Sequence, residues 1–367
     1  MEQGTTPATY LPDELVVEIL ARLPAKSLCR FKCVSHRWRR LISDPVHRAR
    51  FVQTLSGFFF LSDEGPRFRF AALPSSVTPL EEDGDGPPLV DAALSFLPPR
   101  CGKIEMLDSC NGLLLLRCYN ELSSSPPPPF YVVCNPATRE WVALPQPRYN
   151  GYGQGARTWW WRWIGMTRCS IAAVEVYSSE TGTWVLRECK PEWIDFYGRM
   201  TYFNGSLHLP IEHEEVVSVD PNGQSWKVTQ VRHCEDHGHR EGRGYVGHCR
   251  GRLIYANNDR KYDVLSIYVR EDQASREWIM KHNVSKSDLL FEPWKHMLKP
   301  TYYIAGFHPD GDLVFFYDRT RNMLISYDMN HGDWHVVCTL EDFKHAHHPF
   351  FPYVPWYSRG LASPNIN

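Results

Sequence analysis

The sequence predicts a chain of two parts, a short α-helical module followed by a large all-β domain built as a propeller of four-stranded blades. Two observations carry this prediction. Residues 11–51 have the apolar spacing of amphipathic helices, and residues 131–334 repeat an apolar strand, a polar turn and a tryptophan. At 367 residues the chain exceeds an average domain, which fits one small unit and one large unit.

The helical module begins at Leu11-Pro12. Proline suits the first turn of a helix, because its missing N–H costs nothing there, and Asp13 and Glu14 place negative charge at the positive end of the helix dipole. Pro24 ends this helix. Apolar residues recur at helical spacing on both sides of Pro24: Leu15, Val16, Ile19, Leu20 and Leu23 before it, and Leu28, Phe31, Val34, Trp38, Leu41 and Ile42 after it. A module of about forty residues is near the lower limit for an independent core, so we expect it to bind a partner. A helical cap on the downstream domain is the alternative.

The order of these residues resembles the F-box family. The matching phrases are Leu11-Pro12-x-Glu14-Leu15, Ile19-Leu20-x-x-Leu23-Pro24, Ser27-Leu28 and Cys33-Val34-Ser35-x-x-Trp38. The resemblance implies a three-helix F-box that binds the Skp-type adaptor of a cullin–RING ubiquitin ligase. Carried over by position, the candidate adaptor-binding residues are Leu11, Pro12, Leu15, Ile19, Leu20, Leu23, Pro24, Leu28, Val34 and Trp38. The sequence does not divide them between contact residues and the module's own core.

A basic helix-turn-helix that binds DNA is a competing interpretation of the module. Residues 1–50 carry nine Lys and Arg against five Asp and Glu, and Arg37, Arg39 and Arg40 form a cluster. The remaining residues carry 31 basic against 37 acidic side chains. A solvated helix end, with arginines near the negative pole of the dipole, explains the cluster more simply. With a net charge of −2, we expect neither nucleic acid nor a membrane as a partner.

We expect no targeting signal in this sequence. Residues 1–10 lack the basic and apolar regions of a signal peptide, and no apolar run approaches a membrane span. The eleven cysteines include no CxxC pair and are expected to be reduced and buried. We therefore expect a cytoplasmic or nuclear protein. The expected boundaries are a disordered N-terminus at 1–10, the F-box at 11–51, the propeller at 52–360 and a C-terminal tail at 361–367.

The repeat of the second part has five copies, and in each a tryptophan follows the first turn residue by six positions. Asn, Ser and Asp at the head of a turn can bond the backbone two residues on, so each copy predicts a hairpin. The turn residues are Asn135, Ser178, Asp220, Asp272 and Asp328, and the tryptophans are Trp141, Trp184, Trp226, Trp278 and Trp334. Four copies are preceded by a second hairpin turn, at Asn111-Gly112, Asn204-Gly205, Arg250-Gly251 and Asp310-Gly311.

Each unit thus holds four short strands in about 45 residues, the size of a propeller blade. The segments Gly57–Leu61 and Arg67–Ala72 are expected to supply one more blade, which Phe350–Trp356 closes with a C-terminal strand. The copy ending at Trp184 has a degenerate first half. We favour six blades, with seven as the alternative.

The same stretch resembles the F-box-associated domain of plant F-box proteins, a kelch-like β-propeller. The matching phrases are Ser109-Cys110-Asn111-Gly112-Leu113, Asn135-Pro136-Ala137-Thr138-Arg139-Glu140-Trp141, Leu144-Pro145, Phe307-His308-Pro309 and Pro352-Tyr353-Val354-Pro355. The chain departs from the family at 148–173, where a tryptophan run replaces a glycine and aromatic phrase. Strand alternation would send Trp159, Trp161 and Trp163 to one face. Core packing is the simpler interpretation. The alternative is an exposed platform for a target, with Trp159, Trp161, Arg162 and Trp163 as candidate target-binding residues.

The sequence predicts no catalytic residue, no metal site and no cofactor. The cluster His233-Cys234-x-x-His237-x-His239 is irregular and lies in a charged, glycine-bearing segment, which favours a loop over a zinc site. No nucleophile elbow, phosphate loop or HExxH helix occurs. The resemblance therefore implies a non-catalytic substrate receptor of an SCF-type ubiquitin ligase, with a target protein of unknown identity. The alternatives are an F-box scaffold without a degradative role and a propeller enzyme with an appended F-box.

Overall fold

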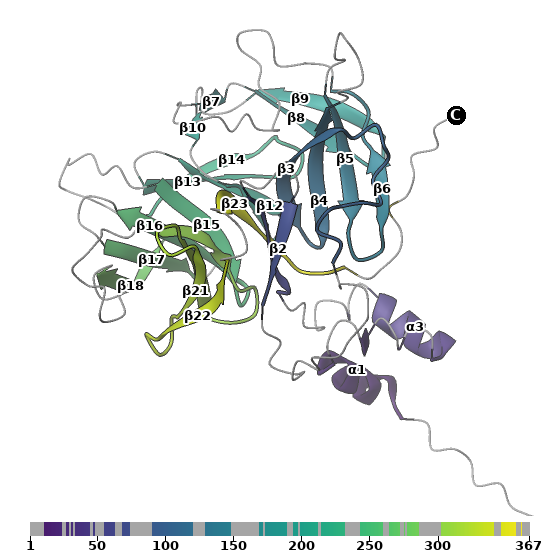
Figure 1. Cartoon of the computed structure of the whole chain (residues 1–367), viewed down its shortest axis with the longest axis horizontal. Coiled ribbons are helices and arrows are strands. Elements are labelled where there is room, and N and C mark those ends of the chain that lie inside the picture. The colour runs from purple at the N-terminus through teal and green to yellow at the C-terminus, as the bar shows by residue number, and fades with distance from the viewer. Residues whose placement is uncertain are drawn as a thin grey trace, which may run out of the picture.

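The computed structural model describes the chain at residues 11–23, 27–28, 31, 34–44, 47, 55–62, 68–73, 90–119, 129–147, 169–171, 173–188, 194–196, 199–211, 214–231, 243–259, 264–271, 275, 277–285, 302–340, 346–356 and 361. A pair of helices comes first and a ring of β-sheets follows (Figure 1). In this described part, no helix is long and apolar enough to cross a membrane.

The helices α1 (Asp13–Ala21) and α3 (His36–Ser43) pack around a small core of their own. Ser35 starts α3, because its hydroxyl accepts a hydrogen bond from the Trp38 backbone N–H at 3.1 Å. The apolar run after Pro24 therefore does not continue as one helix. The expected helix between α1 and α3 falls on residues 24–33, of which the structure describes 27, 28 and 31, so the three-helix arrangement stays a prediction.

Within the described residues, the strands form five antiparallel blades. One blade consists of β1 (Gly57–Ser62), β2 (Phe68–Ala72) and β23 (Ala346–Tyr353), and the next of β3 (Lys103–Cys110), β4 (Leu113–Tyr119), β5 (Phe130–Asn135) and β6 (Glu140–Ala143). A third consists of β10 (Ile194–Phe196), β11 (Thr201–Phe203), β12 (Ser206–Ile211), β13 (Glu215–Val219) and β14 (Trp226–Gln230), with β7 (Cys169–Ile171) added on β10. The last two are β15 (Arg243–Cys249), β16 (Arg252–Asp259), β17 (Val264–Arg270) and β18 (Ile279–Ser285), and β19 (Tyr302–Phe307), β20 (Leu313–Asp318), β21 (Met323–Asp328) and β22 (Trp334–Thr339).

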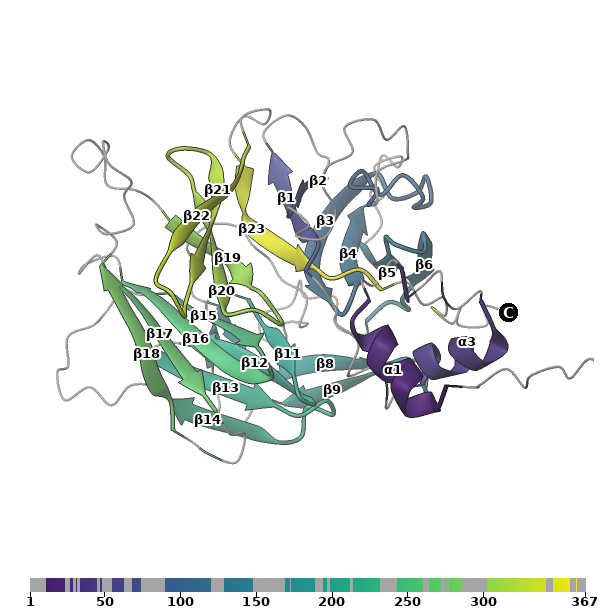
Figure 2. The same cartoon turned by 90° about the horizontal axis from the view of Figure 1, so that it is seen from below.

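The blades stand side by side around a common centre. Their inner strands touch in the order β3, β23, β19, β15 and then β11 and β12. In Figure 1, β12 and β23 lie near the centre of the ring and β6, β18 and β22 at its outside. The largest apolar clusters form between neighbouring blades, as where β16 and β17 pack on β19, β20 and β21. Figure 2 shows α1 and α3 outside the ring, beside the blade of β3 to β6.

The two ends of the domain share one blade, as the sequence predicted. Strand β23 pairs with β1, with Gly57 opposite Tyr353, and β1 pairs in turn with β2. The C-terminal strand thereby becomes the inner strand of the first blade and holds the ring closed. The expectation that these three segments build one blade is confirmed, with a C-terminal strand that runs over Ala346–Tyr353 where Phe350–Trp356 was predicted.

The predicted count of six blades, with seven as the alternative, is wrong for the described residues. The hairpin ending at Trp184 was expected to complete a blade, but β8 (Ala173–Ser178) and β9 (Thr183–Glu188) form a two-stranded ribbon. Strands β7 and β10 flank this ribbon in sequence, and they pair with each other and extend the following blade. The ribbon bridges its neighbours, since Trp184 Nε1 donates to Pro145 O at 2.8 Å and Arg187 Nε donates to Asn222 O at 3.0 Å. Within the described residues, the degenerate first half of this repeat adds no strand to the ribbon, so the ribbon does not become a four-stranded blade.

Most hairpin turns have the predicted chemistry. Asn135 Oδ1 accepts the Ala137 N–H at 3.0 Å, two residues on. Positive φ angles occur at both central residues of three predicted turns: Asn111 and Gly112, Asn204 and Gly205, and Arg250 and Gly251. The fourth turn is different, because His308 Nδ1 accepts the backbone N–H groups of Asp310 and Gly311 at 3.1 and 2.8 Å. A side chain therefore fixes that turn in place of positive φ angles.

Candidate functional site

The helical module exposes four large apolar side chains, Leu11, Leu15, Ile19 and Val34, with 47 to 61% of their surface accessible. We call these four residues the exposed apolar set. Leu11, Leu15 and Ile19 are spaced four residues apart, so they follow one line along the start of the module and α1. The neighbouring helical row, with Val16 among its members, is buried in the core against α3. A soluble chain keeps an apolar surface of this kind where a partner covers it.

The structure divides the predicted adaptor-binding residues into two groups. Leu11, Pro12, Leu15, Ile19 and Val34 are exposed. Leu20 and Leu28 are buried in the module's core, and Leu23 and Trp38 are half-buried against it. Pro24 lies outside the described residues. The exposed residues are therefore the candidates for direct contact, and the buried residues hold the helices that present them.

Arg37 belongs to the architecture of the module. Its Nε donates to Asp13 Oδ1 at 2.6 Å, and its Nη2 donates to the Leu11 carbonyl oxygen at 2.5 Å. These bonds fasten the first turn of α3 to the segment that carries Leu11 into α1. Arg37 thus lies near the start of its helix, where it supports the exposed apolar set, and the interpretation of a solvated helix end does not hold for this residue.

The propeller offers a second candidate site, a cavity of about 130 Å³ at its centre. Each of the five blades lines this cavity through an inner strand, namely β3, β11, β15, β19 or β23. Asn111 and Pro309, from the turns that follow β3 and β19, line it as well. The cavity therefore reaches the end of the ring where the predicted two-residue turns lie.

Arg199 is the central charged group of this cavity. It lies between β10 and β11, and its Nη2 donates to Asp108 Oδ1 at 2.7 Å. Its Nη1 donates to the Phe350 carbonyl oxygen at 2.6 Å, and its guanidinium lies 4.7 Å from the ring centre of Phe351. Burial alone would lower the pKa of Arg199, but the Tyr245 hydroxyl and the Asp108 carboxylate more than offset burial and raise it. The guanidinium is therefore charged.

A backbone irregularity places Asp108. The register between β3 and β4 shifts between Met106 and Asp108, and such bulges re-aim side chains near functional sites. Asp108 Oδ1 accepts the Ser109 N–H at 2.8 Å as well as the bond from Arg199. Among the described residues, no hydrogen bond reaches the second carboxylate oxygen, Oδ2, and Asp108 lines the cavity. One acceptor oxygen of this carboxylate is thus available to a ligand.

The sequence did not predict this second site. Asp108 directly precedes the matched phrase Ser109-Cys110-Asn111-Gly112-Leu113, but it resembles any charged residue near a turn. Arg199 lies in a segment without a repeat motif. No short pattern marks Asp108, because its strand also carries the charged residues Lys103 and Glu105, which do not line the cavity.

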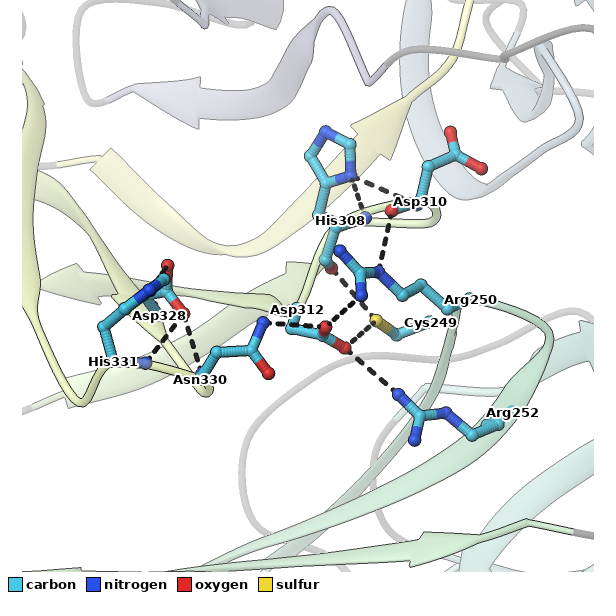
Figure 3. A network of polar contacts seen from close by, with 10 residues as sticks. Cys249, Arg250, Arg252, His308, Asp310, Asp312, Asp328, Asn330 and His331 are labelled. Carbon is cyan, nitrogen blue, oxygen red and sulfur yellow. Dashed lines mark hydrogen bonds and ion pairs between the residues drawn. The ribbon is translucent and has the colours of Figure 1, made fainter.

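A third polar cluster joins the turns of two blades (Figure 3). The buried Asp312 carboxylate accepts hydrogen bonds from Arg252 Nη2 at 3.1 Å and Asn330 Nδ2 at 2.9 Å, and Arg250 Nη1 lies 2.7 Å from it. Cys249 Sγ donates to the Gly311 carbonyl oxygen at 3.0 Å. Burial, together with Asp312, raises the pKa of Cys249 to about 12, so the thiol stays protonated and unreactive. The partners within the cluster satisfy one another, which indicates a structural role.

Two predicted regions lie outside the described residues. These are the candidate target-binding residues Trp159, Trp161, Arg162 and Trp163, and the histidine and cysteine cluster at 233–239. Both interpretations stay predictions.

Comparisons with known proteins agree with both parts of the chain. Residues 9–49 match the F-box domain family, and residues 160–350 match the family described as F-box protein At3g26010-like, beta-propeller. The F-box protein At5g07610 of Arabidopsis thaliana is 26% identical over 327 residues, which cover 79% of this chain and 74% of that protein. The putative F-box protein At3g52320 of the same plant is 33% identical over 158 residues, which cover 42% of this chain and 36% of that protein. A chain in the crystal structure of the mitotic checkpoint complex aligns at 15% identity with a TM-score of 0.33, over 71% of this chain and 74% of that chain.

Proposed function

Because this chain belongs to the family of F-box proteins with an At3g26010-like β-propeller, as its motifs predicted, we propose that it is the substrate-recognition subunit of an SCF-type ubiquitin ligase. The F-box binds a Skp-type adaptor and, through it, the cullin–RING ligase. The propeller binds a target protein, in the cytoplasm or the nucleus. The chain contributes proximity and no catalytic side chain, because it raises the effective concentration of the target near the conjugating enzyme.

The exposed apolar set is the observation that carries this proposal. A module of about forty residues has little apolar surface to spare, because its own core is already at the lower limit of size. This module nevertheless leaves Leu11, Leu15 and Ile19 in solvent while a parallel row is buried. An adaptor that covers the exposed row would gain hydrophobic free energy without any rearrangement of the core.

Adaptor binding is tested by changing Leu15 and Ile19 together to serine. Full burial of one such side chain contributes about 1.5–3 kcal/mol. The module itself covers about half of each exposed side chain, so the adaptor removes only the other half from water. The double change should therefore cost about 1.5–3 kcal/mol in total. This corresponds to an affinity for the purified adaptor that is about 10- to 150-fold weaker by isothermal titration calorimetry.

Val185→Ser is the matched control, because Val185 is an exposed apolar residue of β9 in the propeller. The control should bind the adaptor like the unchanged chain. Circular dichroism should show the same helix content in all three proteins. Unchanged adaptor affinity in a folded Leu15 and Ile19 double variant would overturn the F-box part of the proposal.

The receptor part is tested by reconstitution of the ligase. Proteins that become ubiquitinated only when this chain is present, and no longer when the double variant replaces it, are the expected result. A chain that binds the adaptor and yields no such proteins would be a scaffold, as in the alternative considered for the sequence.

A further inference from the structure

We propose that the cavity at the centre of the propeller is the pocket for the target, and that it takes one basic side chain, lysine or arginine, against the Asp108 carboxylate. This inference rests on the proposed receptor function and names the chemistry that the propeller recognises. It follows from the juxtaposition of one available carboxylate oxygen with apolar side chains and aromatic rings, in a cavity that all five blades line.

The charged groups of the cavity favour a cation over an anion. Arg199 already donates to Asp108 and to the Phe350 carbonyl oxygen and stacks on Phe351. An anionic ligand would have to displace Asp108, which the Ser109 N–H also holds. The Asp108 side chain is 30% exposed, against 13% for Arg199. A cation reaches Oδ2 without breaking any of these bonds.

The other titratable groups that line the cavity do not oppose a cation. His248 stacks on Phe203, with 5.2 Å between the ring centres, and burial lowers its pKa, so the ring is neutral at pH 7. Burial raises the pKa of the Cys110 thiol to about 12, and this group is neutral as well. Burial raises the pKa of Tyr245, so its hydroxyl keeps its proton at pH 7.

The size and walls of the cavity fit a single long side chain. A volume of about 130 Å³ corresponds to about four waters at 30 Å³ each. Leu55, Met200, Phe307 and Val354 supply apolar surface for the methylene stem of lysine or arginine. Tyr202 is 44% exposed and lines the same cavity, where its ring can attract a cation.

Small ions provide the direct test. Ligand-observed NMR on the full chain would compare n-butylammonium and n-butylguanidinium with n-pentanoate and n-butanol, each titrated into the millimolar range. We expect the two cations to bind and the anion and the alcohol to bind at least tenfold more weakly. Preferential binding of pentanoate, or equal binding of all four, would overturn the proposal.

Two variants assign the binding to this cavity. Asp108→Asn keeps an oxygen for Arg199 and Ser109 but removes the negative charge, and it should weaken butylammonium binding at least tenfold. Tyr202→Ser leaves the pair of Asp108 and Arg199 intact and should weaken the same ion about threefold, which keeps the test decisive if Asp108→Asn fails to fold. Asp220→Asn, in the exposed turn between β13 and β14, is the control and should bind like the unchanged chain. Full binding by a folded Asp108→Asn or Tyr202→Ser variant would contradict the pocket.

Adaptor affinity is measured on the same samples, which separates the two proposals. Asp108→Asn should bind the adaptor normally. If the cations bind and the adaptor does not, the pocket stands and the receptor function fails. If the adaptor binds and the cations do not, the receptor function stands and the basic side chain is wrong.

Discussion

Asp312 holds the turns of two neighbouring blades together, and Asp312→Asn tests this role with little change of shape. The carboxylate is 6% exposed, and its two partners Arg250 and Arg252 are 54% and 34% exposed. Oδ2 faces Arg250 and Asn330, while Oδ1 faces Arg252 and Cys249. All four neighbours present donors. The amide of the Asp312→Asn variant can take two orientations, and in either one its NH₂ group faces another donor and makes no hydrogen bond there.

The magnitude follows from these contacts. A hydrogen bond to a charged group contributes about 1.5–3 kcal/mol, and a buried group left without a partner costs about 1–3 kcal/mol. The exposed arginines recover part of their hydration, which lowers the cost of losing the charge. We expect Asp312→Asn to reduce the free energy of unfolding of the propeller by about 2–3 kcal/mol. The melting temperature should fall by about 4–10 °C.

The assay is thermal unfolding of the full chain, followed by differential scanning calorimetry and by tryptophan fluorescence. Glu271→Gln is the control, because Glu271 forms an exposed ion pair with Lys281 at 2.8 Å in the same blade as Arg250. This change should leave the melting temperature where it was. If Asp312→Asn had the same melting temperature as Glu271→Gln, the network in Figure 3 would not stabilise the contact between the blades.

Two further predictions concern the pH dependence and the C-terminal segment. Burial, with a smaller effect of Arg270, lowers the pKa of His208 from 6.5 to about 4, so the unfolded chain binds this proton first. The free energy of unfolding should therefore fall by about 1.4 kcal/mol per pH unit from pH 6.5 toward pH 4. Urea titrations at pH 7 and pH 5 should show a smaller loss of stability between the two pH values for His208→Gln than for the unchanged chain. An equal loss would show that His208 is not the group responsible. Gly112 and Gly205 both have a positive φ, of 78° and 75°. They differ in the space around them. A Cβ added to Gly112 would lie 2.4 Å from Trp356 Cβ, whereas a Cβ added to Gly205 would meet nothing within 4 Å. Gly205→Ala should therefore reduce the free energy of unfolding by about 1–2 kcal/mol, for the strained φ alone. Gly112→Ala should reduce it clearly more in the same urea titration. Equal reductions for the two variants would exclude packing of Trp356 on this turn.

The features that the sequence predicted well are local. An Asn or Asp at the head of a turn binds N–H groups a few residues away, as at Asn135 and Asp328, so its effect is visible in a short window. The apolar rows of α1 are local as well. The sequence shows both rows of this helix, but the choice of the buried row depends on where α3 packs, and that contact joins residues more than twenty positions apart.

The blade count shows where local signals fail. Each repeat predicts its own hairpin, and the hairpin of β8 and β9 forms as predicted. The repeat does not determine which sheet the flanking strands join. Ile194 of β10 pairs with Ile171 of β7, although the hairpin of β8 and β9 lies between them in sequence. Phe196 of β10 pairs with Ile211 of the next blade. Pairing of this kind depends on the free edges available in the folded ring, which no short pattern records.

The central cavity is the extreme case, because the contacts of Arg199 that join its blades are distant in sequence. Asp108 and Arg199 are separated by 91 positions, and Arg199 and Phe350 by 151. A charged residue next to a turn is usually solvated, so neither Asp108 nor Arg199 signals burial. The buried charge of Arg199 gains its full set of hydrogen bonds only when the ring closes. The reason is that the Phe350 carbonyl oxygen, which accepts from Arg199, belongs to the C-terminal strand that pairs with β1. Closure of the ring and completion of the site are therefore one event. A variant that weakens the pairing of β1 with β23 should disturb the cation pocket, while the exposed apolar set of the F-box, which has a core of its own, should still bind the adaptor.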